Sequence, residues 1–204
     1  MRENGLLLVL SGPSGVGKGT LAASLQKALP DMSLSVSVTT RSPRRGETNG
    51  VSYHFLSAAG FEALIKEDRL LEWAKVYGNY YGTLRESVTE VLNQGKDVLL
   101  EIDIQGAFQV KERLPEAILI FTVPPTLAEL RRRLEGRATD SPAEIERRLG
   151  CFIDEIALAH KYDYIVKNDD MVLAEQKIRW IIEAERLRPE RLRGFLKSFG
   201  GDNE

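Results

Sequence analysis

The segment SGPSGVGKGT, at residues 11–20, contains the spacing G-x-x-x-x-G-K, which is typical of loops that bind nucleotide phosphates. Glycines let consecutive backbone N–H groups converge on anionic oxygens, and the following helix adds its positive dipole end. A strand-like run, LLLVL, precedes the loop, and an amphipathic run, KGTLAASLQKAL, follows it. We therefore predict a nucleotide site in which Lys18 reaches the outer phosphates. Its members are Gly12, Pro13, Ser14, Gly15, Val16, Gly17, Lys18, Gly19 and Thr20.

The residue after Lys18 departs from the usual pattern. A Ser or Thr normally stands there and its hydroxyl contacts Mg²⁺, whereas this chain has Gly19 and places the hydroxyl one position later, at Thr20. Mg²⁺ keeps several waters in most protein sites, so a water could connect the metal to the protein. We expect a modified but working loop that binds a nucleotide together with Mg²⁺, although the loop alone indicates only this general class.

The elements that must position this loop form an alternating pattern. Near-continuous apolar runs separated by helical patterns favour a parallel sheet covered by helices on both faces. Ligands of such sheets bind beyond the carboxyl ends of the strands. The predicted strands are residues 6–10, 34–38, 97–104, 118–123 and 162–167. The predicted helices are residues 18–29, 84–94, 105–113, 126–135, 142–160 and 171–187.

Two stretches do not follow this alternation. Residues 39–83 are polar and rich in Gly, Tyr and Arg, and they show only a short helical pattern near 58–68. Residues 131–148 carry six arginines. Within them the segment SPAE places Ser141 at an N-cap position and Glu144 three residues later, so a new helix should begin at about residue 142. The basic segment at the end of the chain is expected to be frayed or solvated.

The composition limits the remaining possibilities. A chain of 204 residues with 43% hydrophobic and 28% charged residues suits a single domain, and a net charge of −2 does not favour nucleic acid or anionic lipid. The single cysteine, Cys151, excludes an internal disulfide, and we expect it to be buried. His54 and His160 show no zinc-ligand spacing. The apolar run at 6–10 is too short for a membrane span and lacks the features of a secretory signal, so a cytoplasmic protein is expected.

Three further segments carry a family resemblance. Together with the phosphate loop, the segments SVSVTTRSPRRGETNGVSYHF (35–55), LEWAKVYGNYYGT (71–83) and LLEIDIQG (99–106) resemble guanylate kinases, over about residues 6–188. The resemblance implies a single α/β domain of the P-loop NTPase type, with a core at about 1–34, 84–125 and 151–204. It also implies an inserted GMP-binding region at about 35–83 and a lid at about 126–150. The implied reaction is phosphoryl transfer from ATP to GMP with Mg²⁺. We also expect dGMP to be used, since no identified residue reads the ribose 2′-OH, and we expect no obligatory protein partner.

The resemblance assigns the acceptor phosphate to a group of arginines and tyrosines. Paired guanidinium groups and phenol hydroxyls suit a phosphate dianion, because they form charge-assisted hydrogen bonds to its oxygens. A solvated basic turn with surface tyrosines is the alternative interpretation. The residues that match the family are Arg41, Arg44, Tyr53 and Tyr81.

Recognition of the base is assigned by the same resemblance to a carboxylate. Guanine presents two adjacent donors, N1–H and the exocyclic amine, which one carboxylate accepts together, and a buried acceptor discriminates strongly against other bases. Glu72 matches this position; a half-exposed acid beside Trp73 is the alternative. Asp103 has a double assignment, to base and to metal, and the role of Glu101 stays open. The further base contacts are Ser37, Thr83 and Asp103.

Arginines of the implied lid complete the predicted site. Phosphoryl transfer gathers negative charge while water is kept out, and a closing lid that bears arginines meets both needs. Arg133 is expected to join the lid arginines, whereas Arg131, Arg132 and Arg147 suit an exposed face. Asn168 matches a position near the donor adenine. The predicted catalytic set is Lys18, Arg44, Arg137 and Arg148.

Two other functions fit parts of the pattern. Guanylate-kinase-like modules of scaffold proteins bind phosphopeptides without turnover, but they lack a complete phosphate loop and lid, which this chain keeps. A kinase of another small phosphorylated acceptor would share the architecture, although Glu72 and the paired tyrosines favour guanine. Activity on GMP therefore separates the three possibilities.

Overall fold

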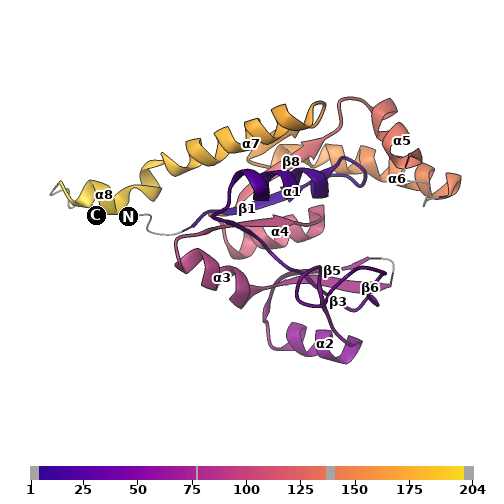
Figure 1. Ribbon diagram of the computed structural model, residues 1–204, viewed down its shortest axis with the longest axis horizontal. Helices are drawn as coiled ribbons and strands as arrows, with labels where there is room; N and C mark the ends of the chain where they lie inside the picture. The colour runs from indigo at the N-terminus through magenta and orange to yellow at the C-terminus, as the bar shows by residue number, and fades with distance from the viewer. Residues whose placement is uncertain (1–4, 77, 137–140, 200–204) are drawn as a thin grey trace.

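The centre of the molecule is a five-stranded parallel sheet (Figure 1). The computed structural model describes residues 5–76, 78–136 and 141–199. All four pairings in the sheet are parallel, which confirms the predicted fold class. In spatial order the strands are β2 (Met32–Leu34), β7 (Asp97–Glu101), β1 (Leu7–Ser11), β8 (Ile118–Val123) and β9 (Tyr164–Lys167).

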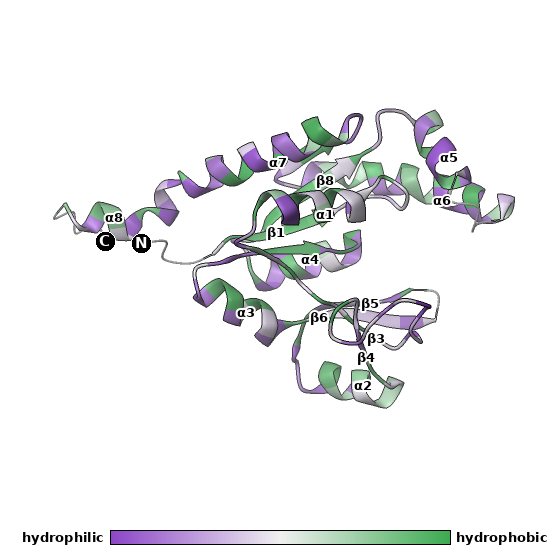
Figure 2. Ribbon diagram, in the orientation of Figure 1, coloured by the Kyte–Doolittle hydropathy of each residue, from purple (hydrophilic) through white to green (hydrophobic). Residues whose placement is uncertain are grey.

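Helices cover both faces of this sheet because neighbouring strand residues point to opposite sides. On one face Leu8 and Leu10 pack in a buried cluster with Leu21 of α1 and Ile178 of α7. On the other face the alternate residues of β1 pack against α3 and α4. Figure 2 shows the strands as a hydrophobic centre between helices that are polar on their outer sides. These helices are α1 (Lys18–Ala28), α3 (Arg85–Asn93), α4 (Ile104–Arg113) and α7 (Met171–Arg186).

A second sheet, of four strands, lies beside the core, and the sequence analysis missed it. The expectation that residues 39–83 hold only a short helix was wrong, since α2 packs on β-strands through a small core of Val38, Phe61 and Leu70. Two of these strands have only two residues each, and the two longer ones mix polar with apolar residues, so they lack the continuous apolar runs of the core. The elements are β3 (Val38–Thr39), β4 (His54–Phe55), α2 (Ala58–Lys66), β5 (Leu70–Val76) and β6 (Asn79–Leu84).

The predicted strand at 34–38 was also wrong, because the chain crosses between the two sheets there. Leu34 ends β2, where the Ser35 N–H still donates to the Leu99 carbonyl at 3.0 Å. Val38 begins β3 in the second sheet. The apolar positions 34, 36 and 38 match a single strand in sequence, but the partners on either side of the crossing belong to different sheets.

Two helices near the phosphate loop, α5 (Leu127–Glu135) and α6 (Pro142–Ala157), pack on it through Leu130, Leu134 and Val16. The predicted start of α6 is confirmed, since the Ser141 side chain accepts a hydrogen bond from the Glu144 N–H. Cys151, expected to be buried, is exposed. The apolar stripe of α6 runs through 145, 149 and 152, and a residue two positions after 149 points away from it.

The end of the described chain extends away from the core as a short arm (Figure 1). It consists of a 3-10 turn at Pro189–Arg191 and α8 (Arg193–Lys197), so part of the segment expected to be frayed is helical. A further 3-10 turn, Ala159–Lys161, precedes β9. Among the residues described, no helix is long and apolar enough to cross a membrane.

Candidate active site

The phosphate loop connects β1 to α1 at the carboxyl end of the parallel sheet. Gly15 and Gly17 have φ values of 92° and 94°, a region that other residues adopt only with strain. Gly12 lies against β8, where a Cβ atom would be 2.3 Å from the Thr122 carbonyl oxygen. The glycines therefore supply both the turn and the close contact that this loop conformation needs.

Lys18 is the first residue of α1, and its side chain folds back over the loop. The ammonium Nζ donates to the carbonyl oxygens of Gly12 at 2.5 Å and Pro13 at 3.0 Å. This geometry holds a positive charge over the loop, where it is available to bind phosphates.

A cavity of about 400 Å³ separates the loop from the second sheet. The core contributes the loop and the end of β7, and the second sheet contributes side chains from β5, β6 and the segments before β3 and β4. The structure thus brings together residues that are far apart in the sequence. Those among the predicted site residues that line this cavity are Ser14, Lys18, Ser37, Tyr53, Glu72, Tyr81 and Asp103.

Glu72 is a buried carboxylate in the wall of this cavity. Its exposed fraction is only 4%, which excludes the half-exposed alternative. Burial raises the pKa of Glu72 to about 7, the charge of Asp103 adds to the rise, and a hydrogen bond from Thr83 opposes it. That bond joins Thr83 Oγ1 to Glu72 Oε1 at 2.6 Å. A Cβ at position 106 would lie 2.5 Å from Glu72 Oε2, so Gly106 makes room for the carboxylate.

Thr83 and Asp103 occupy supporting positions around Glu72. Thr83 is fully buried and is not among the residues that line the cavity. Its hydrogen bond to Glu72 therefore orients the carboxylate rather than contacting a ligand. Asp103 lines the cavity and also caps α4, because its Oδ1 accepts a hydrogen bond from the Gly106 N–H at 2.8 Å. One carboxylate oxygen of Asp103 is therefore committed to the fold.

The predicted phosphate-binding arginines are organised by a residue that the sequence analysis missed. Glu47 forms an ion pair with Arg41 at 2.8 Å and accepts a hydrogen bond from the Arg44 N–H at 2.7 Å. The hydrogen bond that Arg41 donates to Glu47 raises the pKa of Arg41, and the guanidinium carbon of Arg41 lies 5.3 Å from the Tyr53 ring centre. The side chain of Arg44 is exposed. An acid six residues after Arg41, in the same turn, was the available signal.

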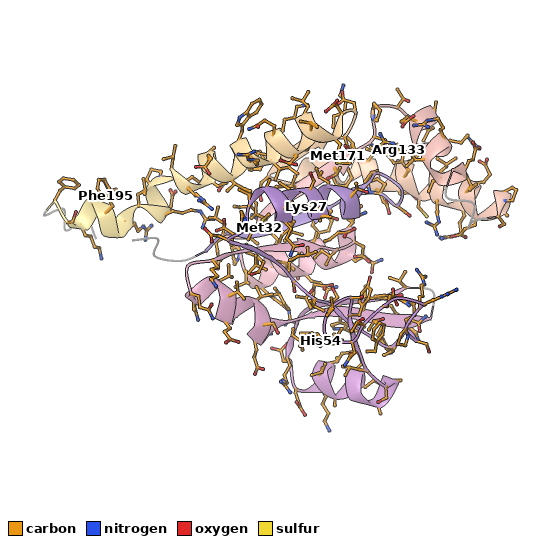
Figure 3. The ribbon with its side chains drawn as sticks, in the orientation of Figure 1. Lys27, Met32, His54, Arg133, Met171 and Phe195 are labelled. Atoms are coloured by element: carbon orange, nitrogen blue, oxygen red, sulfur yellow. The ribbon has the colours of Figure 1, made fainter. Side chains whose placement is uncertain are left out.

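A second cavity, of about 460 Å³, lies on the other side of the loop, and α5 forms part of its wall. Arg133 donates to the carbonyl oxygens of Val16 at 3.2 Å and Asn168 at 3.0 Å, and it pairs with Glu129. The buried Asn168 side chain donates to Val16 at 2.8 Å. Arg133 and Met171, labelled in Figure 3, line the cavity from α5 and α7. Arg133 and Asn168 thus brace the phosphate loop from this side.

Of the two lid arginines predicted to be catalytic, the structure describes Arg148. Its Nη1 donates to Ser14 Oγ at 2.7 Å, and its Nε donates to Glu144 at 3.1 Å, so a guanidinium from α6 reaches the loop. Arg137 lies outside the described residues. The arginines expected on an exposed face pair with neighbouring acids: Arg131 with Glu146, Arg132 with Glu129 and Arg147 with Glu144.

Comparison with known proteins identifies the family. A family model described as "Guanylate kinase" matches residues 4–185. This chain belongs to the guanylate kinase family. The guanylate kinases of Halalkalibacterium halodurans and Caldanaerobacter subterraneus subsp. tengcongensis are each 50% identical to it over 191 residues. The match covers 94% of this chain in both cases, and 94% and 93% of the two relatives.

Comparison with solved structures also finds a guanylate kinase similar to this chain. A crystal structure of guanylate kinase from Anaplasma phagocytophilum superposes with a TM-score of 0.79 at 35% identity, covering 99% of each chain. A shikimate kinase from Bacteroides thetaiotaomicron, at 16% identity and a TM-score of 0.51, shares the fold alone, over 87% of this chain and 98% of its own.

A further carboxylate of this guanylate kinase family member went unnoticed in the sequence. Glu155 lies on α6 seven residues after Arg148, two helical turns along the same face, and is partly buried. Burial raises the pKa of Glu155, while the positive charge of Lys18 opposes the rise. The i, i+7 spacing from a lid arginine was the signal for it.

The end of the sheet away from the loop also has a cavity, of about 280 Å³, in which four of the charged lining groups form two ion pairs. Lys111 pairs with Asp163 at 2.9 Å, and Arg188 pairs with the buried Glu185 at 2.9 Å. It lies at the amino ends of β8 and β9, away from the phosphate loop. The candidate site of this guanylate kinase family member is therefore the pair of cavities on either side of the loop.

Proposed function

We propose that this chain catalyses phosphoryl transfer from ATP to GMP, giving ADP and GDP. Family membership supports the reaction class, and the carboxylate of Glu72 supports the choice of acceptor. When ionised, this carboxylate accepts the two adjacent donors of guanine, whereas adenine would leave it facing a lone pair. The buried Glu72, held by Thr83 in the cavity wall, is the observation that carries the proposal.

The residues around the loop act through position and charge. Lys18 and the loop N–H groups bind the phosphates of ATP, and Arg148, together with Arg137, stabilises charge on the transferred group. Arg41, Arg44, Tyr53 and Tyr81 hold the phosphate of GMP. The attacking atom is already an anionic phosphate oxygen, so no protein base is required, and catalysis rests on alignment and electrostatics.

Mg²⁺ is the proposed cofactor. The donor set fits it, because the carboxylate of Asp103 lines the cavity beside Lys18, and Mg²⁺ prefers oxygen ligands with several retained waters. Among the described residues, no three His, Cys, Asp or Glu side chains form a metal-holding group, so most ligands would come from phosphates and water. When bound, Mg²⁺ neutralises charge on the outer phosphates. Asp103 is the residue that we assign to orienting it.

The two inserted regions divide the substrates between them. We assign residues 35–83 to GMP and residues 126–150 to a lid over the donor, with Thr20, Arg133 and Asn168 on the side of the ATP adenine. The recognition contacts that we assign to GMP lie on its base and phosphate. We therefore expect dGMP to serve as an acceptor as well.

The test is ADP production from Mg-ATP, with GMP, dGMP, AMP, CMP and UMP offered separately to the purified protein. Rapid turnover with GMP and dGMP alone supports the proposal. Turnover with another acceptor would remove the role of Glu72 in selecting guanine and keep the kinase reaction. Binding of GMP without turnover would contradict the proposed reaction.

A further inference from the structure

Strand β5 is an edge strand of the second sheet, and its pairing with β6 is irregular just before Glu72. Leu70 lies opposite Leu84 and Glu72 lies opposite Thr83, so one extra residue, Leu71, is inserted on the β5 side. A bulge of this kind re-aims side chains. Leu71 packs in the buried cluster that joins α3 and α4 to the parallel sheet, so the bulged part of β5 lies against α4.

The side chain of Gln109, on α4, covers the free edge of β5 one residue beyond Glu72. Its Oε1 accepts a hydrogen bond from the Trp73 N–H at 3.1 Å, and its Nε2 donates to the Trp73 carbonyl oxygen at 2.8 Å. The amide thus pairs with both backbone groups of one residue, as a neighbouring strand would at a sheet edge. A shift of β5 along α4 would break both bonds together.

A second contact holds β5 on the other side of Glu72. Arg113 follows Gln109 by four residues and so lies on the same face of α4. Its Nη1 donates to the Leu70 carbonyl oxygen at 2.8 Å. In Figure 1, α4 lies between the parallel sheet and the second sheet. The helix therefore fixes β5 at Leu70 and at Trp73, with Glu72 between them.

The N-terminal end of the same helix lies in the acceptor cavity. Asp103 is the N-cap of α4 and lines this cavity together with Glu72, whereas Gln109 is not among the lining residues. A fixed register between α4 and β5 therefore sets how the two carboxylates lie relative to each other. Hydrogen bonds weaken steeply as distance and angle depart from their optimum, so this register affects how well guanine is read.

We propose that Gln109 is a positioning residue for the selection of guanine: its amide holds the bulged edge of β5 on α4 and so fixes Glu72 beside Asp103. The inference rests on the proposed function and deepens it. The competing role is a contribution of Gln109 to the packing of α4 alone, and the test separates the two.

The first variant is Gln109→Met, which keeps the length of the side chain and removes both hydrogen bonds. We expect kcat/KM for GMP to fall by about tenfold, because the binding groups lose alignment with the acceptor. The preference for GMP over inosine monophosphate, which lacks the exocyclic amine, should fall by at least about threefold. The KM for ATP should stay unchanged. Gln94→Met, at the exposed end of α3, is the matched control.

A stability control on the same helix is Val110→Ala. Val110 is fully buried in the cluster beneath α4, so this variant should lower the melting temperature while it leaves the amide in place. Its preference for GMP over inosine monophosphate should equal that of the wild type. If the preference falls in both variants in proportion to the lost stability, Gln109 has only a structural role and the inference is overturned.

The coupling between Gln109 and Glu72 is tested in a double variant. Because Gln109 acts through Glu72, adding Gln109→Met to Glu72→Gln should lower kcat/KM for GMP by less than about twofold. A further tenfold loss would show independent action and refute the proposal. If Gln109→Met fails to fold, Gln109→Glu replaces it; this variant keeps an acceptor for the Trp73 N–H and loses the donor, and it should show an intermediate loss of preference.

The outcomes separate this inference from the proposed function. If the wild type does not prefer GMP, the proposed function fails and this inference fails with it. If the wild type and Gln109→Met prefer GMP equally, the proposed function stands and the role of Gln109 is overturned.

Discussion

The two sheets that enclose the acceptor cavity differ in how they present chemistry. The parallel core buries large apolar clusters on both faces and contributes one glycine-rich loop, over which the side chain of Lys18 folds. The four-stranded sheet has a small core and contributes side chains from several strands, among them Glu72 and Tyr81. The contacts that we propose for the donor phosphates thus come largely from one loop, whereas base selection depends on the assembly of distant segments. Each prediction below perturbs one side of this division.

The largest effect is expected from the core side, at Lys18. Lys18→Ala should lower kcat by about 10³-fold, because it removes the charge aimed at the moving phosphoryl group. The melting temperature should stay close to that of the wild type, since the two carbonyls to which Lys18 donates, those of Gly12 and Pro13, belong to the same surface loop rather than to the core. Near-normal turnover in this variant would overturn the loop assignment.

On the side of the second sheet, Glu72→Gln should lower kcat/KM for GMP by about 10²-fold, since the amide replaces an acceptor with a donor facing guanine. The KM for ATP should change little, because Glu72 belongs to the acceptor cavity. Steady-state kinetics with each substrate varied in turn measures this, and Glu62→Gln, an exposed site on α2, is the matched control. An equal loss for ATP would break the division between the two sheets.

The same substitution should stabilise the unliganded protein. Because the pKa of Glu72 is raised to about 7 from its ordinary 4.5, the folded state binds more protons than the unfolded state between these values. Stability therefore falls as pH rises through this window, and the penalty, about 3 kcal/mol, is complete above pH 7. Glu72→Gln removes it, so its melting temperature should exceed that of the wild type at pH 8. The difference should vanish near pH 4.

Arg148 tests the contact between the lid and the loop. Arg148→Ala should lower kcat by roughly 10- to 100-fold, the value of one charge-assisted hydrogen bond made in the transition state. Arg147→Ala, the adjacent arginine, should leave kcat within twofold, because it pairs with Glu144 on the exposed side of α6. Similar losses in both variants would indicate that α6 contributes only its overall charge.

The smallest predicted effect is a pH dependence of the acceptor side. Since we propose that ionised Glu72 binds guanine, kcat/KM for GMP should fall by up to about tenfold as pH decreases from 7 to 6. The phosphate of GMP also gains a proton near pH 6, so the profile is compared with that of Glu72→Gln. That variant should lose the component near pH 7 and keep the one near pH 6.

The sequence predicted the core well because its signals are local. The glycine loop, the apolar runs of β1 and β8 and the cap at Ser141 each depend on neighbours within a few residues, and the structure confirms them. The strand predicted at 34–38 failed because its two ends pair with different sheets. The prediction that Cys151 is buried was wrong because burial on an amphipathic helix depends on which side of the helix packs against the rest of the protein.

By itself, the sequence determined the phosphate loop, the helix that follows it and the family to which the chain belongs, since contiguous motifs carry all three. Only the tertiary structure decided that Glu72 is buried with a raised pKa, because its burial depends on residues of other elements, such as Gly106, packed around it. It also decided that Thr20 faces the donor cavity while Glu101 faces Gly19. The physical reason is that a strand pairing and a helix rotation fix these directions, and neither is encoded within the motif itself.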